Sequence, residues 1–150
     1  MRTLLCLLLF AAAPAWAQVK VENAWARATP PGAKIGAGYM TLRNDSASAD
    51  KLLSASSPAA AKVETHVTIK EGEISKMRPA KGYDIPAHGA FELKPGGAHL
   101  MLVDLKAPLR EGERVPLVLR FRHSGEVRVE LEVRPLGATG AMPGMHGSMH

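Results

Sequence analysis

From Val19 onward, hydrophobic and polar residues alternate in short runs, and none of these runs repeats its hydrophobic positions at the helical period of about 3.6 residues. The clearest run lies near the end of the chain, where Val127, Val129, Leu131 and Val133 are separated by single charged residues. Alternation of this kind is typical of a β-strand that covers a hydrophobic core with one face. The same pattern predicts further strands over residues 19–25, 35–43, 51–55, 63–70, 74–78, 91–94, 98–105 and 115–121.

Turn-forming residues separate the predicted strands. They occur at Pro30-Pro31-Gly32, Asn44-Asp45, Pro95-Gly96-Gly97 and Ser124-Gly125. About nine short strands joined in this way predict an all-β domain, either a β-sandwich or a Greek-key barrel. We expect its large core side chains to be Trp25, Tyr39, Phe91 and Phe121.

The two ends of the chain differ from this pattern. Residues 1–17 combine Arg2, a short apolar run and the sequence Ala15-Trp16-Ala17, which is typical of a secretory signal peptide with its cleavage site. The apolar run is roughly half as long as the ~20 residues of a membrane span. Residues 137–150 are rich in Gly, Ala, Met, Ser and His and are predicted to be a flexible tail. The sequence therefore predicts one compact domain over residues 18–136, with no membrane span after processing.

The composition excludes several classes of protein and of functional site. The chain carries 19 Lys and Arg against 14 Asp and Glu, a formal net charge of +5, and it has no basic run interleaved with aromatic residues, so nucleic acid is not an expected partner. Its one cysteine, Cys6, lies in the predicted signal peptide, which leaves the processed chain without a thiol. This excludes a blue-copper electron-transfer site and a cysteine nucleophile. Serine-hydrolase and zinc-metalloprotease motifs are absent from the sequence, and we expect a protein that is not an enzyme.

Histidine and methionine residues recur where the predicted strands bring them together. His66 lies on the predicted strand 63–70, on the face that points away from the core, and Met77 lies on the next strand. A two-residue turn at Glu71-Gly72 would place His66 directly opposite Met77. A turn at Gly72-Glu73 would make Met77 a diagonal neighbour on the same face, whereas a three-residue turn would separate the two side chains.

A second pair of side chains lies on the predicted strand 98–105. His99 and Met101 are two residues apart and therefore share one face of that strand. Thioether sulfur is a soft, neutral donor that favours Cu(I), whereas Zn²⁺, Ca²⁺ and Mg²⁺ sites use thiolate, imidazole, carboxylate or carbonyl ligands. Two His with two Met therefore favour Cu(I), and a site without thiolates escapes disulfide chemistry in an oxidising compartment. If each residue is considered alone, the alternative is that the His are polar surface residues and that the Met pack in the core.

The spacing of these four residues, H-x10-M-x21-H-x-M, resembles the motif of the periplasmic PCuAC copper chaperones. Three further stretches resemble that family: residues 21–44, KMRP at 76–79 and ELKPGGAHLML at 92–102. The resemblance covers nearly the whole processed chain. It implies a cupredoxin-like Greek-key β-barrel or sandwich that is monomeric and binds one Cu(I). The ligands that it implies are His66, Met77, His99 and Met101.

The same resemblance implies a location and a partner. It predicts a periplasmic protein that delivers copper to the dinuclear centre of cytochrome c oxidase subunit II, alongside a Sco-type thiol protein. Two alternatives remain open. One is a periplasmic copper scavenger or buffer without a dedicated acceptor, and the other is a metal-free Ig-like interaction module. Copper binding excludes the second alternative, whereas an acceptor protein is needed to exclude the first.

The predicted tail is rich in copper-binding residue types. These residues are Met142, Met145, His146, Met149 and His150. We expect them to form a second copper site that feeds the first, in which Met residues bind Cu(I) and His residues could accept Cu(II); a low-complexity end with incidental ligands is the alternative. The other candidates are predicted to have no copper role, since His88 and His123 lie in predicted turns and Met40 lies in an apolar strand.

Overall fold

A computed structural model of the chain describes residues 19–139, which form ten β-strands and no helix. The strands are β1 (Val19–Arg27), β2 (Ile35–Asn44), β3 (Asp50–Ser56), β4 (Ala60–Glu71), β5 (Ile74–Pro79), β6 (Tyr83–Ile85), β7 (Gly89–Leu93), β8 (His99–Leu105), β9 (Arg114–Phe121) and β10 (Gly125–Arg134). No helix in this part of the chain is long and apolar enough to cross a membrane. The predicted signal peptide and residues 140–150, with all five candidate copper ligands of the tail, lie outside the described residues.

Seven of the strands close into a barrel. Neighbouring strands pair in the order β4-β8-β2-β1-β10-β9-β3, and a further pairing of β3 with β4, at Ala55 and Val63, joins the two ends. The pairings are antiparallel except that β1 and β10 run parallel. Closure leaves no free edge within this ring of strands. The predicted all-β fold is therefore confirmed, and of its two forms the barrel is the one observed.

The alternation in the sequence explains why these segments form strands. In β10, Leu131 and Val133 are buried in the barrel, whereas Arg128 and Glu130 on the opposite face are exposed. A strand with this pattern is stable only when its apolar face packs against other strands. The one exception within β10 is Arg134, which is buried and donates to the side-chain oxygen of Asn23 at 2.9 Å.

The large side chains predicted for the core do not all lie inside the barrel. Three of the four predicted core anchors are buried, and the fourth, Phe91, is partly buried and stacks on Tyr83. The three buried anchors are Trp25, Tyr39 and Phe121. Only Phe121 belongs to the hydrophobic cluster of the barrel, whereas Trp25 and Tyr39 contact each other, with ring centroids 4.6 Å apart, and line surface grooves. A Cβ atom at Gly36 in β2 would lie 2.9 Å from the Cδ1 atom of Leu109, so the Leu109 side chain would have to shift.

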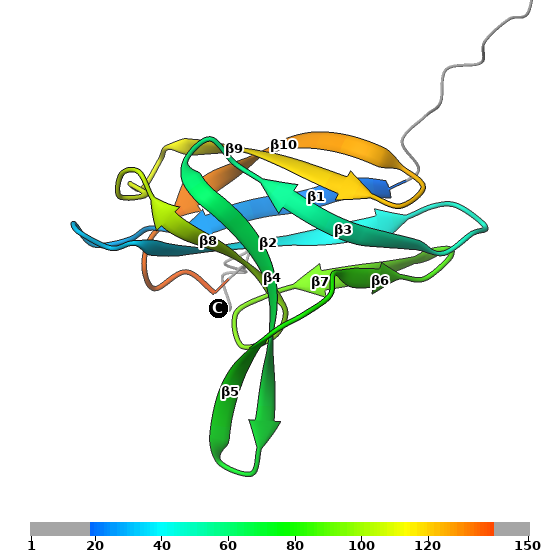
Figure 1. The fold of residues 1–150 in the computed structure, drawn as a ribbon, viewed down its shortest axis with the longest axis horizontal. Coiled ribbons are helices and arrows are strands. Elements are labelled where there is room, and N and C mark those ends of the chain that lie inside the picture. Colours follow the sequence, from blue (N-terminus) through cyan, green and yellow to red (C-terminus); the bar gives the residue numbers. More distant parts are fainter. Residues whose placement is uncertain (1–18, 140–150) are drawn as a thin grey trace, which may run out of the picture.

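Three strands lie outside the closed ring. β6 pairs with β3, β7 pairs with the second half of β2, and β5 pairs with β4. The β4–β5 hairpin extends away from the barrel (Figure 1). β4 pairs with β8 up to His66 and with β5 from His66 onward, so this residue lies where the chain leaves the barrel.

The predicted strands all occur, but their ends and number differ in detail. β4 begins at Ala60 rather than at residue 63, because its first residues pair with β8 although they lack a clear alternation. The sequence pattern also missed β6, which spans only Tyr83–Ile85. Three residues are too few to show a period of two, so this strand depends on its pairing with β3.

Candidate metal centre

The turn of the β4–β5 hairpin decides how the two candidate ligands of these strands lie. Its two central residues are Gly72 and Glu73, so Met77 pairs with Thr68 and is a diagonal neighbour of His66. Of the two arrangements that two-residue turns allow, the one with Met77 directly opposite His66 does not occur, and the diagonal one is observed. The reason is the backbone of Gly72, which has a φ of 66°. The observed turn places this glycine at the first central position, where a positive φ is needed, whereas the earlier turn would place a glutamate there.

β4 and β8 place the two histidines side by side. His66 and His99 are directly opposite each other in the antiparallel pair, and their ring centroids are 5.8 Å apart with 26° between the ring planes. Two imidazoles that share one metal ion have centroids about 5–6 Å apart, given nitrogen–metal bonds of about 2 Å. The histidines are only 8% and 6% exposed, respectively. The pattern of β4 alone, which turns His66 away from the core, could not show that the neighbouring strand covers it.

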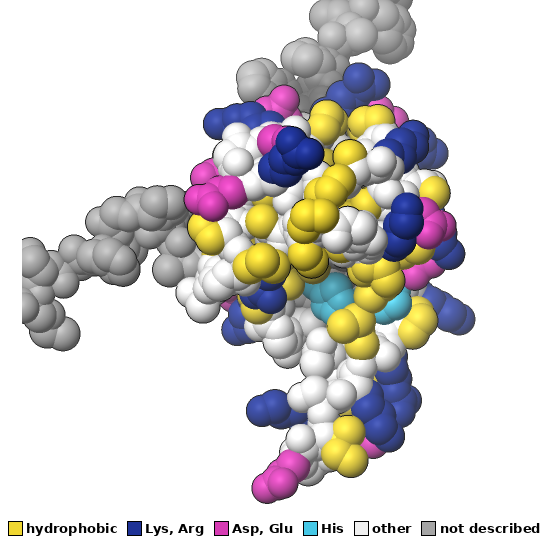
Figure 2. All heavy atoms as spheres, turned by 90° about the vertical axis from the view of Figure 1, so that its left-hand side faces the viewer, with side chains coloured by type: hydrophobic (Ala, Val, Ile, Leu, Met, Phe, Trp, Pro, Cys, Tyr) yellow, Lys and Arg dark blue, Asp and Glu magenta, His cyan; other side chains and the backbone are white. Residues whose placement is uncertain are grey.

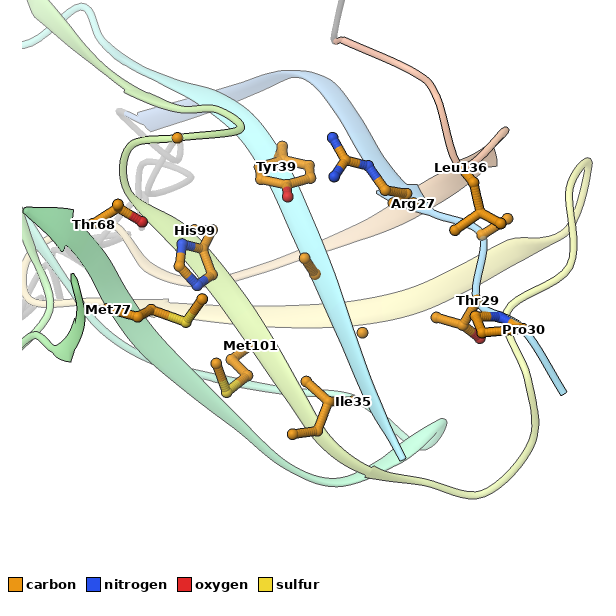
Figure 3. Close-up of a pocket in the computed structure, with 14 residues that line it drawn as sticks. Arg27, Thr29, Pro30, Ile35, Tyr39, Thr68, Met77, His99, Met101 and Leu136 are labelled. Carbon is orange, nitrogen blue, oxygen red and sulfur yellow. The ribbon is translucent and has the colours of Figure 1, made fainter. Parts of the chain in front are cut away.

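Met77, His99 and Met101 line one groove of about 320 Å³ beside the hairpin. Figure 3 shows the two methionine side chains approaching the ring of His99 from β5 and from β8. Met101 faces the groove because Leu100 and Leu102, its neighbours on β8, are fully buried on the core side. The predicted shared face of His99 and Met101 is therefore confirmed. Met77 is the most accessible of the three, with 56% of its surface exposed.

The opposite wall of the groove is apolar at its rim. Ile35 and Leu136 line it and are 55% and 59% exposed. The guanidinium of Arg27 lies 5.8 Å from the ring centroid of Tyr39 in the same wall. None of the described residues that line the groove is Asp or Glu. Figure 2 shows histidine side chains among hydrophobic ones where the hairpin meets the barrel, with Lys and Arg along the hairpin.

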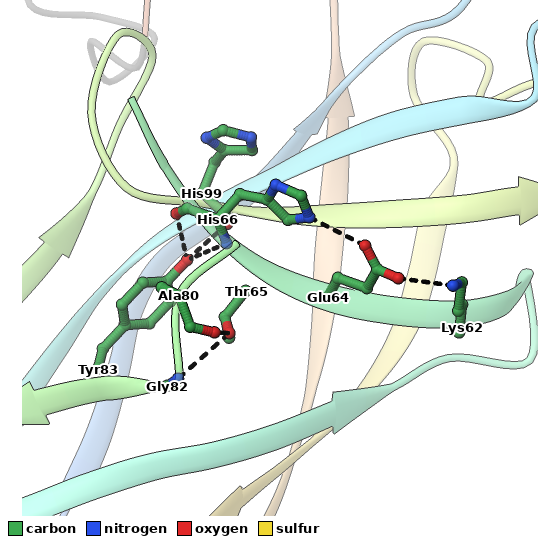
Figure 4. A network of polar contacts seen from close by, with 8 residues as sticks. All are labelled: Lys62, Glu64, Thr65, His66, Ala80, Gly82, Tyr83 and His99. Atoms are coloured by element: carbon green, nitrogen blue, oxygen red, sulfur yellow. Dashed lines mark hydrogen bonds and ion pairs between the residues drawn. The ribbon is translucent and has the colours of Figure 1, made fainter. Parts of the chain in front are cut away.

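Glu64 fixes the ring of His66. Nε2 of His66 lies 2.9 Å from a carboxylate oxygen of Glu64, and the other oxygen lies 2.6 Å from Nζ of Lys62 (Figure 4). Hydrogen bonds from Lys62 and then from His66 hold the pKa of Glu64 below its usual value, so the carboxylate is ionised and accepts the Nε2 proton. Nδ1 of His66 is buried and has no hydrogen-bond partner. In this tautomer Nδ1 carries the lone pair that a metal ion needs.

The ring of His99 is held from its other side. Its Nδ1 lies 3.3 Å from the carbonyl oxygen of Gly97, which leaves Nε2 as the nitrogen available to a ligand. Burial lowers the pKa of His99, the hydrogen bond to Gly97 raises it, and the nearby His66 lowers it; the net shift is downward. A lowered pKa favours the neutral imidazole, which is the form that binds metals.

The donor set of this site depends on sulfur. Among residues 19–139, no group of three or more His, Cys, Asp or Glu side chains could hold a metal ion. A centre beside the groove would therefore combine the imidazoles of His66 and His99 with the thioethers of Met77 and Met101. These residues fit a soft, monovalent metal ion better than a hard divalent one.

Tyr83 of β6 connects the main chains of both histidines. Its Oη accepts the N–H of His66 at 2.9 Å and lies 2.7 Å and 2.6 Å from the carbonyl oxygens of His66 and His99. Burial raises the pKa of Tyr83 to about 12, so the phenol keeps its proton and can donate it. Sequence reasoning identified neither Tyr83 nor Glu64. The alternation of β4 could have indicated Glu64, which shares a strand face with His66, but nothing in the sequence pattern indicates Tyr83.

The remaining histidines and methionine of the described residues lie away from the groove. His88 and His123 are exposed and belong to turns, as predicted. Met40 is 1% exposed and packs in the barrel core, which confirms its predicted packing role. None of these three residues lines the groove that contains Met77, His99 and Met101.

Fold and side chains together define a cupredoxin-like barrel protein with a surface site lined by His and Met. More specifically, the chain belongs to the LpqE-like family, described as "Putative lipoprotein LpqE-like", whose sequence profile matches residues 19–133. The chain is 33% identical over 117 residues to "Putative lipoprotein Lxx21020" of Leifsonia xyli subsp. xyli, covering 77% of this chain and 69% of that protein. It is 29% identical over 124 residues to "Uncharacterized protein RP573" of Rickettsia prowazekii, covering 80% and 68%. Membership of a lipoprotein family indicates an extracellular or envelope location.

Solved structures of PCuAC domains share the fold. The copper-bound PCuAC domain from PmoF2 superposes with a TM-score of 0.69 at 24% identity, covering 79% of this chain and 93% of that one. The solution structure of Cu(I)-bound DR1885 from Deinococcus radiodurans gives a TM-score of 0.65 at 32% identity, covering 87% of each chain. These likenesses confirm the predicted cupredoxin-like fold, and with the family match they support a PCuAC-type protein.

Proposed function

We propose that the chain is a copper chaperone that carries one Cu(I) ion. Its ligands are His66, Met77, His99 and Met101. The observation that carries the proposal is the convergence of two imidazoles and two thioethers beside one groove, with Nδ1 of His66 buried and without a hydrogen-bond partner. Two neutral sulfur donors favour Cu(I) over harder ions. The likeness to Cu(I)-bound DR1885, at 32% identity, supports the same metal.

The four ligands divide into a fixed part and an accessible part. His66 and His99 are buried on barrel strands, and Glu64 holds one ring from behind through a hydrogen bond that fixes its orientation. Met77 lies on the projecting hairpin and is 56% exposed. Since thioethers bind Cu(I) without charge compensation, a ligand of the acceptor protein can replace Met77 first. The arrangement therefore combines retention of copper with release to a partner.

The proposal includes a location and an acceptor. After removal of residues 1–17, the chain works in the periplasm as a monomeric carrier rather than as an enzyme. It delivers copper to the dinuclear centre of cytochrome c oxidase subunit II, alongside a Sco-type protein. The resemblance of the ligand spacing to PCuAC chaperones supports this acceptor, and the lipoprotein names of the family and of the Leifsonia relative support an envelope location.

A second copper site in the tail completes the proposal. The Met and His residues at 142, 145, 146, 149 and 150 bind a further copper ion, as Cu(I) or Cu(II), and pass it to the groove. The bias of this short segment toward soft and imidazole ligands supports the assignment. A tail without a copper role would leave the chaperone function of the barrel site unchanged.

Anaerobic loading tests the barrel site. We expect purified protein to take up Cu(I), and the double variant His66→Ala/Met101→Ala to lose most of its affinity in competition with a chromophoric Cu(I) chelator. His123→Ala is a matched control, because His123 is an exposed histidine away from the groove. If the wild-type chain took up no Cu(I), the proposed function would be wrong and the metal-free interaction module would be favoured. If the double variant kept full affinity, the proposed ligand set would be wrong.

Transfer to an acceptor separates a chaperone from a buffer. Cu(I)-loaded protein is mixed with the copper-free soluble domain of oxidase subunit II, and formation of the dinuclear centre is followed optically. A chaperone transfers copper faster than the same amount of Cu(I) held by a small chelator of equal affinity. An equal or slower rate would favour the copper buffer.

A further inference from the structure

Tyr83 lies between the two strands that carry the histidines, and the barrel fixes its place. The residue is 3% exposed, and its ring stacks on Phe91 with the centroids 4.8 Å apart. Its strand, β6, pairs with β3, where Tyr83 is opposite Leu52. Figure 4 shows its phenol oxygen reaching the main chain of His66 and His99. The ring of Tyr83 is therefore held by β7 and its main chain by β3, neither of which belongs to the β4–β5 hairpin.

The phenol oxygen bridges the two strands at the point where they separate. β4 pairs with β8 up to the opposed residues His66 and His99, and then turns to pair with β5. Main-chain groups at such a junction lose regular strand partners and must be satisfied otherwise when they are buried. Tyr83 accepts from the N–H of His66 and donates toward the carbonyl oxygen of His99 at 2.6 Å. One hydroxyl therefore ties the two strands together at the ligand pair.

We propose that Tyr83 is a positioning residue of the copper site. Its hydroxyl sets the separation of β4 and β8 at His66 and His99, and so holds the two imidazoles at the spacing that one Cu(I) ion needs before copper arrives. Tyr83 acts through the main chain and is not itself a ligand. The inference rests on the proposed function, because the spacing of the rings has this meaning only if both histidines bind the same ion.

The hydroxyl, rather than the ring, carries this role. Tyr83→Phe keeps the stacking on Phe91 and the burial of the ring, but it leaves the main-chain groups of two opposed residues without their shared partner. The strands must then move together or admit water to satisfy these groups. Either change alters the spacing of the imidazoles. Removing an interaction that orients metal ligands typically lowers metal affinity by about 10–100-fold.

The test compares Tyr83→Phe with Thr65→Val. The hydroxyl of Thr65 donates to the carbonyl oxygen of Ala80 at 2.6 Å and accepts the N–H of Gly82 at 3.3 Å. The control variant therefore loses a hydroxyl with two bonds beside the site, but neither bond involves a histidine. Both variants are compared with the wild-type chain at a temperature at which all three are folded.

Amide hydrogen exchange measures the effect in the copper-free protein. We expect Tyr83→Phe to remove the protection of the His66 N–H selectively. The N–H of Thr68, which donates to the carbonyl oxygen of Gly97 at 3.1 Å, serves as an internal reference and keeps its protection. Equal loss at both amides would mean that the hairpin as a whole is loosened, and unchanged protection at His66 would mean that the phenol does not hold its main chain. Both results would overturn the inference.

Competition titration with Cu(I) measures the effect on the site. We expect Tyr83→Phe to bind Cu(I) about tenfold more weakly and Thr65→Val to bind it as the wild-type chain does. In a His66→Ala background the same Tyr83→Phe change should cost less, since one of the two positioned ligands is gone. Wild-type uptake with unchanged affinity of Tyr83→Phe, or with equal losses in both variants, would overturn this inference alone. Absence of uptake by the wild-type chain would overturn the proposed function and this inference with it.

Discussion

The two histidines of the site use opposite ring nitrogens for their hydrogen bonds. His66 binds Glu64 through Nε2, whereas Nδ1 of His99 faces the carbonyl oxygen of Gly97. The nitrogen left for a metal is therefore Nδ1 in His66, close to the main chain, and Nε2 in His99, at the far end of the ring. The residues are opposed on neighbouring strands and their rings stack, so the two remaining ring nitrogens lie at different distances from the main chain.

Two substitutions of Glu64 test whether Cu(I) binding depends on its charge or only on its hydrogen-bonding oxygen. We expect Glu64→Ala to weaken Cu(I) binding about tenfold, because Nε2 of His66 loses the carboxylate that fixes the tautomer. Glu64→Gln should weaken binding less, since an amide oxygen still accepts the Nε2 proton but carries no charge. Competition titration measures both variants, and Glu92→Gln, an exposed carboxylate on β7, is the control. Equal affinities of Glu64→Ala and wild type would show that His66 is held without Glu64.

Asp50 shows that a buried carboxylate in this chain can serve the fold instead of a metal. It accepts the N–H groups of His123 and Ser124, both at 2.9 Å, and the hydroxyl of Ser124 at 2.6 Å. Burial raises the pKa of Asp50, but the hydrogen bonds from Ser124, His123 and Lys51 outweigh it and hold the pKa below its usual value. The ionised carboxylate therefore ties the β9–β10 turn to the start of β3.

The lowered pKa predicts how stability depends on pH. A carboxyl group with a lower pKa in the folded chain contributes its stability above the unfolded pKa, about 3.9, and loses it as the pH falls through the folded pKa. We expect Asp50→Asn to lower the free energy of unfolding by about 1–3 kcal/mol at pH 7 and by less at pH 3. Urea denaturation measures the difference. Asp84→Asn is the control, because the Asp84 side chain is 89% exposed. A difference that does not change with pH would contradict this account of Asp50.

Among the elements, the β4–β5 hairpin shows where prediction from a single sequence reaches its limit. Alternation shows that His66 and Met77 share a face, and this was predicted correctly. It does not reveal the register, because a shift of the turn by one residue moves Met77 by two positions along β4 and keeps its face. The register was decided by the positive φ of Gly72. The turn residues therefore carry information that the hydrophobic pattern lacks.

An insertion in β5 tests whether the face of Met77 matters for copper. An alanine between Ser75 and Lys76 shifts the rest of the strand by one position and turns Met77 to the other face. We expect Cu(I) affinity to fall as far as in Met77→Ala, in the same competition titration. The matched control inserts the alanine between Gly72 and Glu73, which lengthens the turn and leaves the paired residues in place. Retained affinity in the Ser75–Lys76 insertion variant would exclude Met77 as a ligand.

For the whole molecule, the local pattern predicted the strands but not how they close. The alternation in β10 was sufficient to predict an all-β domain. The prediction that His99 and Met101 share one face of β8 was also correct. Closure depends on pairings between strands far apart in the sequence, such as Trp25 of β1 with Glu132 of β10, for which the local pattern carries no signal. The same is true of Tyr83, because its role depends on where β6 packs. Sequence reasoning therefore found the candidate ligands but missed the residue that spaces them.

The structure also suggests where the chain can be cut without loss of the fold. β10, the last strand, ends at Arg134, and the N–H of Ala138 donates to the carbonyl oxygen of Pro135 in the turn that follows. The carbonyl oxygen of Ala138 accepts a hydrogen bond from Arg27 at 3.0 Å, and Arg27 belongs to the wall of the groove. A truncation at residue 137 would remove this contact, whereas truncation after Thr139 keeps it. The later cut therefore separates the role of the tail from that of the barrel.

We expect the chain truncated after Thr139 to keep its melting temperature and its Cu(I) affinity at the groove, because every strand and the Arg27 contact remain. It should bind one copper ion fewer per chain if the tail forms a second site, and it should load the groove more slowly from a dilute copper source. Metal analysis and competition titration measure these quantities. The matched control keeps the full length and replaces the five Met and His residues of 142–150 by Ser, so that only the ligands are lost. Unchanged stoichiometry and loading rate in both variants would show that copper binding is confined to the barrel.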